Sequence, residues 1–190
     1  MGKQFNALQP QHMDFIKQQK IFFVGTAASS GRVNISPKGG DSFRIINENQ
    51  VIWQNLTGSG NETAAHIYHL SRMTLMFCAF EGNPLILRLY GEATAIHKAD
   101  KQWQEYIDLF PLSVGTRQFY HLTIDMVQTS CGMSVPFFDY LDDRDQLTNW
   151  AEARGPEGIH DYWKNRNQHS IDNMETHIVK LAGIADESID

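Results

Sequence analysis

The sequence has few cysteines, no excess of basic charge and no long apolar run. Cys78 and Cys131 lie far apart, which excludes a close-spaced metal-binding pair and a disulfide framework, and both are expected to be reduced. The formal net charge of −6 argues against a nucleic-acid surface, which would need clustered Lys and Arg. The longest apolar runs, such as residues 73–80, are too short to span a membrane. Residues 1–15 lack a signal-peptide core, so we expect a cytoplasmic protein.

Short strand-like segments account for most of the apolar sequence. The 190 residues, 42% of them hydrophobic, suffice for one domain over residues 1–190. Short turns between the segments favour an antiparallel barrel over a parallel sheet, and Gly91 is expected at a bulge. The predicted strands cover residues 21–27, 32–36, 42–46, 51–54, 73–80, 85–97 and 119–129. The predicted helices cover residues 10–19, a stretch from residue 61 and residues 99–109, with two more in a C-terminal helical extension at about 139–173.

Residues 50–63, QVIWQNLTGSGNET, contain the clearest local motif. A strand ends in the turn 57–60, and a helix begins immediately afterwards. The free N–H groups and partial positive charge of a helix start could bind a phosphate between the two glycines. Alternatively, Ser59 and Glu62 have the spacing of a capping box, which would satisfy those N–H groups. The spacing alone favours the capped helix, and the missing Lys after the second glycine excludes a Walker loop.

Five motifs in order resemble the pyridoxamine 5'-phosphate oxidase-like FMN-binding split-barrel family. They are VNISPKGGDSF, NLTGSGNETAAHI, RMTLMFCAFEGNPLILRLYGEA, CGMSVP and KNRNQHSID, and together they run from about Phe22 to Asp172. The resemblance implies a mainly β fold with peripheral helices, a six-stranded antiparallel split β-barrel. It also implies a homodimer with FMN at the subunit interface, and it makes the phosphate site the favoured interpretation of the turn.

The resemblance also implies which residues contact FMN. One strand would run beside the isoalloxazine ring, its paired strand would meet the ring edge and ribityl chain, and the turn would receive the phosphate. Ile35, Leu56 and Trp53 could form an apolar floor for the ring. The implied cofactor-binding residues are Asn34, Ile35, Ser36, Pro37, Lys38, Gln54, Asn55, Leu56, Thr57, Ser59, Gly60, Asn61, Arg88 and Arg117.

Two departures from the family pattern bear on function. The oxidases hold the FMN phosphate with Arg and Lys in the turn after the strand, and this turn has neither, so Lys38, Arg88 and Arg117 are the candidates for that charge. The Arg-x-His pair that grips pyridoxamine phosphate near the C-terminus of the oxidases also has no counterpart. Pyridoxamine phosphate is therefore not the expected substrate.

The resulting hypothesis is a flavin-dependent oxidoreductase that acts on a small molecule, with electrons from NAD(P)H or a similar donor. The alternative is a non-catalytic flavin- or haem-binding or sensing module, and a deazaflavin could replace FMN. No catalytic side chain is assigned, and the loop that carries Cys131 is expected to border a flavin site, either that of its own subunit or that of the other subunit. His66 and His69 lie one helical turn apart, but with no further ligand they are expected to be solvated and to bind no metal.

Overall fold

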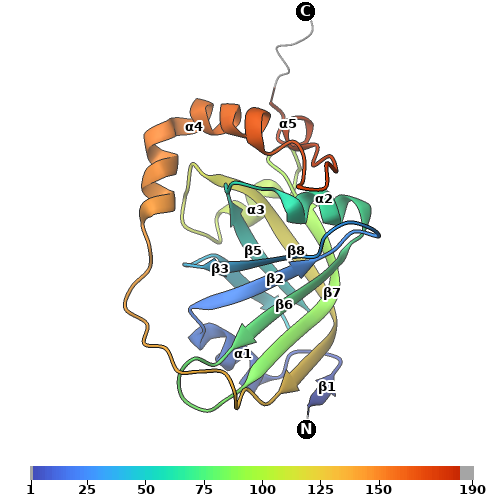
Figure 1. Cartoon of the computed structure of the whole chain (residues 1–190), viewed down its shortest axis with the longest axis vertical. Coiled ribbons are helices and arrows are strands. Elements are labelled where there is room, and N and C mark those ends of the chain that lie inside the picture. The colour runs from blue at the N-terminus through green and yellow to red at the C-terminus, as the bar shows by residue number, and fades with distance from the viewer. Residues whose placement is uncertain (1, 185–190) are drawn as a thin grey trace, which may run out of the picture.

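The computed structural model describes residues 2–184, in which eight strands form one antiparallel sheet that curls into a split barrel (Figure 1). The strands are β1 (Lys3–Phe5), β2 (Ile21–Thr26), β3 (Asn34–Gly39), β4 (Phe43–Asn47), β5 (Gln50–Leu56), β6 (Arg72–Cys78), β7 (Ile86–Ile96) and β8 (Thr116–Ser130). The helices are α1 (Pro10–Gln18), α2 (Glu62–His69), α3 (Trp103–Ile107), α4 (Gln146–Arg166) and α5 (Ile178–Leu181).

The strand order is β3-β2-β6-β7-β8-β5-β4, and β1 pairs with β8. The long strand β8 is the hub of the sheet because it pairs with β7, β5 and β1. Its register with β7 shifts between Tyr90 and Gly91, which confirms the predicted bulge. A Cβ atom at Gly91 would lie 1.9 Å from the backbone oxygen of Thr123. Only glycine therefore allows the two strands to approach so closely at this bend.

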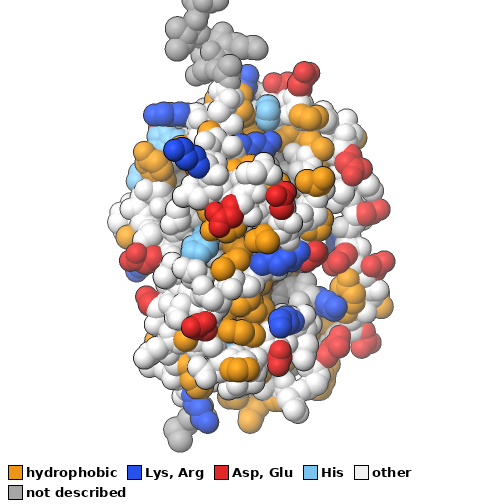
Figure 2. All heavy atoms as spheres, turned by 180° about the vertical axis from the view of Figure 1, so that it is seen from behind, with side chains coloured by type: hydrophobic (Ala, Val, Ile, Leu, Met, Phe, Trp, Pro, Cys, Tyr) orange, Lys and Arg blue, Asp and Glu red, His pale blue; other side chains and the backbone are white. Residues whose placement is uncertain are grey.

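The barrel is filled by large apolar side chains from the inner face of the sheet. Trp53 and Tyr120 are fully buried there, and their rings stack with centroids 4.7 Å apart. A second apolar cluster contains Ile159, Trp163 and Ile178. It joins α4 to α5 at the upper end of the barrel in Figure 1. On the opposite face of the molecule, Figure 2 shows Lys and Arg side chains interspersed with Asp and Glu.

The predicted split-barrel class is confirmed, and the strand count and several boundaries differ. The described residues form eight strands, against seven predicted segments and the six strands that the resemblance implied. The strand without a predicted segment is β1, which at three residues is too short to show a periodic pattern. The strand expected at 32–36 lies at Asn34–Gly39, and the helix expected at 99–109 is only Trp103–Ile107.

Within the helical extension expected at about 139–173, the structure has helix only at Gln146–Arg166. The assignment of residues 1–190 to one domain stays a prediction. This helix bends at Gly155, whose φ of 64° is not helical, just before Pro156. No helix among residues 2–184 combines the length and apolar character that a bilayer crossing requires.

Candidate functional site

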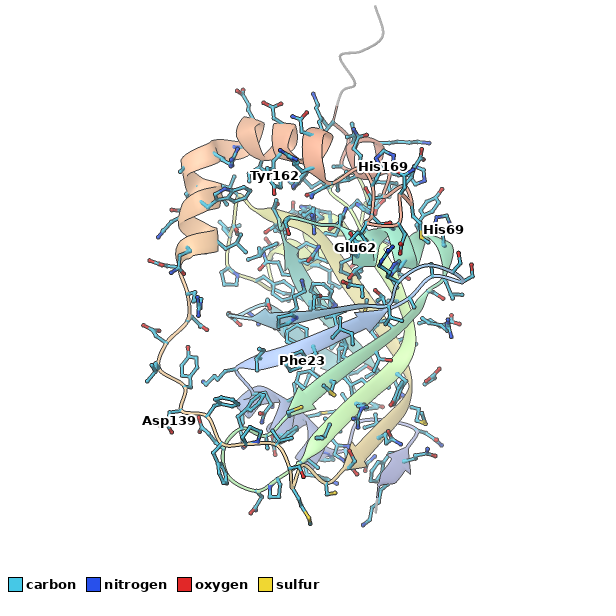
Figure 3. The ribbon with its side chains drawn as sticks, in the orientation of Figure 1. Phe23, Glu62, His69, Asp139, Tyr162 and His169 are labelled. Carbon is cyan, nitrogen blue, oxygen red and sulfur yellow. The ribbon has the colours of Figure 1, made fainter. Side chains whose placement is uncertain are left out.

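A cleft of about 750 Å³ opens between β3, the end of β5, the start of α2 and the chain segment 166–171. Figure 3 shows Glu62, at the start of α2, near the segment that carries His169. The cleft gathers ten of the fourteen residues implied by the resemblance. These ten are Asn34, Ile35, Ser36, Lys38, Asn55, Leu56, Ser59, Gly60, Asn61 and Arg117.

The other four implied residues do not line this cleft. Gln54 is buried, and its Nε2 donates to Thr116 Oγ1 at 2.8 Å. Thr57 is also buried, and its hydroxyl donates to the oxygen of Gly115 and accepts from Trp163 Nε1, both at 2.9 Å. Gln54 and Thr57 therefore brace the strand end and the turn.

Pro37 and Arg88 lie outside the cleft lining for different reasons. Pro37 is exposed on β3. Arg88 lines a separate groove on the outer face of the sheet, where it donates to Ser130 Oγ at 3.0 Å. Trp53, expected beneath the flavin ring, lies instead in the core, with Lys38 Nζ 5.3 Å from its ring centroid.

Two buried or half-buried cations without counter-ions line the cleft, Arg117 and Lys38. Arg117 is only 3% exposed, and its Nη1 donates to the oxygen of Gly60 at 3.0 Å and to Asn167 Oδ1 at 2.6 Å. Neither Arg117 nor Lys38 forms an ion pair with any residue of the described range 2–184. Burial lowers the pKa of Arg117 to about 10. Burial, and then the Arg117 charge, lower the pKa of Lys38 to about 8. Both side chains are therefore charged at neutral pH, and they place uncompensated positive charge in the cleft.

The start of α2 adds hydrogen-bond donors to this site. Asn61 is the N-cap residue, and its side chain does not cap the helix. The expected capping box is wrong, because both carboxylate oxygens of Glu62 instead accept the backbone N–H of Ile171, at 3.0 and 3.1 Å. The partial positive charge of the helix start therefore adds to that of the two cations.

A buried polar network, absent from the sequence-based prediction, holds the turn in place. Asn55 Nδ2 donates to Gln118 Oε1 at 2.8 Å, and Gln118 Nε2 donates to Asn61 Oδ1 at 3.3 Å. From the C-terminal segment, Asn167 Nδ2 donates to the oxygen of Gly58 at 3.2 Å. Asn167 belongs to the motif KNRNQHSID, so the sequence could have indicated it as a site residue. Gln118 lies in a strand outside the five motifs, and nothing in the sequence indicates its role.

The segment after α4 is tied across the cleft to the loop between β2 and β3. The carboxylate of Asp172 accepts the backbone N–H of Arg32 at 2.6 Å and also pairs with the Arg32 guanidinium. These contacts, led by the backbone hydrogen bond, lower the pKa of Asp172. The cleft is therefore bounded by chain segments that are distant in sequence.

The two histidines weighed as metal ligands have separate environments. His66 is buried, contrary to the expectation of a solvated residue, and its Nδ1 lies 3.0 Å from Thr26 Oγ1. His69 contacts the ring of Tyr68. Residues 2–184 contain no cluster of three or more His, Cys, Asp or Glu side chains suited to a metal ion. Cys131 is exposed and does not line the cleft.

Comparison with known proteins shows which family the chain belongs to. The family profile described as pyridoxamine 5'-phosphate oxidase matches residues 8–131. The chain belongs to this family. It is 32% identical over 188 residues to the pyridoxamine 5'-phosphate oxidase family protein ustO of Aspergillus flavus, covering 90% of this chain and 76% of that protein.

Solved structures support the fold. HupZ from Group A Streptococcus has a TM-score of 0.53 and 18% identity, covering 64% of this chain and 98% of its own. A Lactobacillus delbrueckii protein described as a candidate pyridoxamine 5'-phosphate oxidase has a TM-score of 0.52 and 17% identity, covering 65% of this chain and 94% of its own. At these identities the similarity establishes the split-barrel fold alone.

Proposed function

We propose that this protein binds FMN in the cleft and acts, as a homodimer, as a flavin-dependent oxidoreductase on a small molecule. One observation carries the proposal: Lys38 and Arg117 are buried or half-buried cations that lack a carboxylate partner within the described residues. Buried charge without a partner is costly. A dianionic phosphate would offset that cost at a site where helix N–H groups also converge.

The rest of the cleft fits a flat cofactor joined to a phosphate. Ile35 and Leu56 offer apolar contact, and the amide of Asn55 and the hydroxyl of Ser36 offer polar contacts in the same cleft. When bound, the flavin would supply two-electron redox chemistry, with NAD(P)H or a similar reductant as donor. The chain's own contribution is to orient the cofactor and hold positive charge at its phosphate end.

Flavin binding is tested by mixing the full-length protein with FMN, separating them by gel filtration and recording the absorption spectrum. We expect flavin absorption to remain with the protein. Riboflavin, which lacks the phosphate, is the matched control and should bind much more weakly, because it cannot reach the two cations. Equal retention of both, or of neither, would contradict the proposed phosphate site.

Turnover is tested separately by adding NADH or NADPH anaerobically to the flavin-loaded protein. Bleaching of the flavin absorption, followed by its return when an acceptor is added, would support the oxidoreductase. A protein that retains FMN but is reduced by no donor would instead be a binding or sensing module.

A further inference from the structure

A second hollow lies on the outer face of β2, β6 and β7. This groove, with a volume of about 480 Å³, is lined by Phe23, Met76 and Tyr90 among other residues. Figure 3 labels Phe23, which lies on β2. Val33 and Ile35, which are 69% and 68% exposed, line both the groove and the cofactor cleft. The two hollows therefore share a wall.

The groove combines apolar surface with unpaired positive charge. Arg72 and Arg88 line it, and neither forms an ion pair in the part of the chain that the structure describes. Asp125 is the only acidic residue among those that line it. An apolar floor of this kind, rimmed by cations, is suited to an apolar segment that carries negative charge.

Residues 131–145, here called the strap, have that character. The strap contains neither helix nor strand and leads from β8 to α4 along the outside of the barrel (Figure 1). Its Phe137 is 77% exposed and its Leu141 is 92% exposed. Residues 139–145, DYLDDRD, contain four aspartates and one arginine.

The strap is attached to its own chain at only a few points. The backbone N–H of Phe138 donates to the oxygen of Phe80 at 3.1 Å, and Lys20 Nζ lies 5.1 Å from the ring centroid of Tyr140. Figure 3 shows Asp139 at the outer edge of the molecule, well away from Phe23. The strap therefore does not fill the groove of its own chain.

We propose that the strap of a second copy of this chain docks in the groove. Phe137 and Leu141 of the second copy would contact the apolar floor, and its aspartates would face Arg72 and Arg88. The contact is reciprocal in a two-fold dimer. This proposal rests on the homodimer of the proposed function and specifies which surfaces of the two copies meet. In this dimer the second copy covers Ile35, and with it the open wall of the cofactor cleft.

The test measures the mass of the full-length protein by light scattering over a concentration series, without FMN. The wild type is expected to be a dimer. Arg72→Glu and Asp143→Arg, made singly, should each weaken the dimer at least about tenfold, since each places like charges together. Combining the two changes in one chain should restore the dimer, because the charges are then exchanged across the interface.

A second set of variants tests the apolar part of the contact. Phe137→Ser combined with Leu141→Ser should also weaken the dimer, whereas Leu112→Ser should not. Leu112 is the matched control because it is 87% exposed and lies outside both the strap and the groove. Circular dichroism and thermal unfolding establish that each variant is folded.

Three results would overturn the proposal: a monomeric wild type, a dimer unaffected by the strap variants, or single charge reversals without rescue in the combination. FMN retention by the same samples keeps the two proposals separate. A dimer that behaves as expected but retains no FMN would overturn the proposed function and leave the docking proposal in place.

Discussion

Replacing Lys38 by methionine should have opposite effects on the ligand-free and FMN-bound protein. Burial and the neighbouring Arg117 lower the pKa of Lys38 from 10.5 to about 8. Each pKa unit corresponds to about 1.4 kcal/mol, so keeping this lysine charged at pH 7 costs the ligand-free fold at most about 3 kcal/mol. Methionine removes that cost, and with it the contact of the Lys38 ammonium with the Trp53 ring, which is worth about 0.5–2 kcal/mol. Lys38→Met should therefore raise the free energy of unfolding of the ligand-free protein, by about 1–3 kcal/mol.

The same substitution should weaken FMN binding. A charge-assisted contact with phosphate is worth about 1.5–3 kcal/mol, so the dissociation constant should rise roughly tenfold to a hundredfold. Urea unfolding measures the first effect, and fluorescence titration with FMN measures the second. Lys98→Met is the matched control: burial also lowers the pKa of Lys98, but this residue does not line the cleft. It should leave FMN affinity unchanged.

The pH dependence has a defined sign. The pKa of Lys38 is lower in the folded protein than in the unfolded chain, so its cost to the ligand-free fold is complete below about pH 8. That cost is relieved as the pH rises from about 8 to 10.5. Over the same pH range FMN affinity should fall, because deprotonated Lys38 no longer offers a positive charge to the FMN phosphate. Lys38→Met should remove most of this pH dependence. A variant that destabilises the ligand-free protein, or binds FMN as tightly as the wild type, would refute the reasoning.

Three further predictions concern the stability of the fold. Burial lowers the pKa of His97 to about 4, so stability should fall by up to about 3 kcal/mol between pH 6.5 and 4. His97→Gln should flatten that decline in urea unfolding, and an unchanged slope would count against it. Gly91→Ala should lower the free energy of unfolding by more than about 3 kcal/mol, since the added Cβ would clash with the Thr123 backbone. Gly58→Ala is the control because a Cβ there would meet open space. Similar melting temperatures for the two variants would contradict the prediction. Trp163→Phe should lower the free energy of unfolding by about 2 kcal/mol, because the variant loses the hydrogen bond to Thr57 Oγ1 and part of the buried ring volume. Trp150→Phe should lower it less in the same urea assay.

The strands were predictable because their pattern is local. Short continuous apolar runs with β-branched and aromatic side chains mark β2 and β6, and turn formers separate them from their neighbours. The strap was not predictable as an extended segment, since its charges and Leu141 resemble the start of a surface helix. The structure shows that helix begins only at Gln146.

The candidate site was predictable in position but not in detail. Continuous runs of residues were expected to contact FMN, whereas neighbouring residues of a strand face opposite sides. This is why Asn55 lines the cleft while Gln54 braces the chain behind it. Gln118 and Asn167 reach the turn from distant segments, and no local pattern shows which distant side chain will complete a hydrogen-bond network.

The two carboxylates nearest the buried cations, Glu62 in the cleft lining and Asp172, form no ion pair with them. Glu62 and Asp172 could have neutralised the nearby cations, but Glu62 accepts the Ile171 N–H and Asp172 is held by Arg32. Lys38 and Arg117 are thereby left without an ion-pair partner among residues 2–184, which raises the free energy of the ligand-free fold. A phosphate that carries close to two negative charges at neutral pH removes that penalty on binding. The same two residues therefore destabilise the ligand-free protein and supply much of the affinity, so stability and FMN affinity should change in opposite directions when either is neutralised.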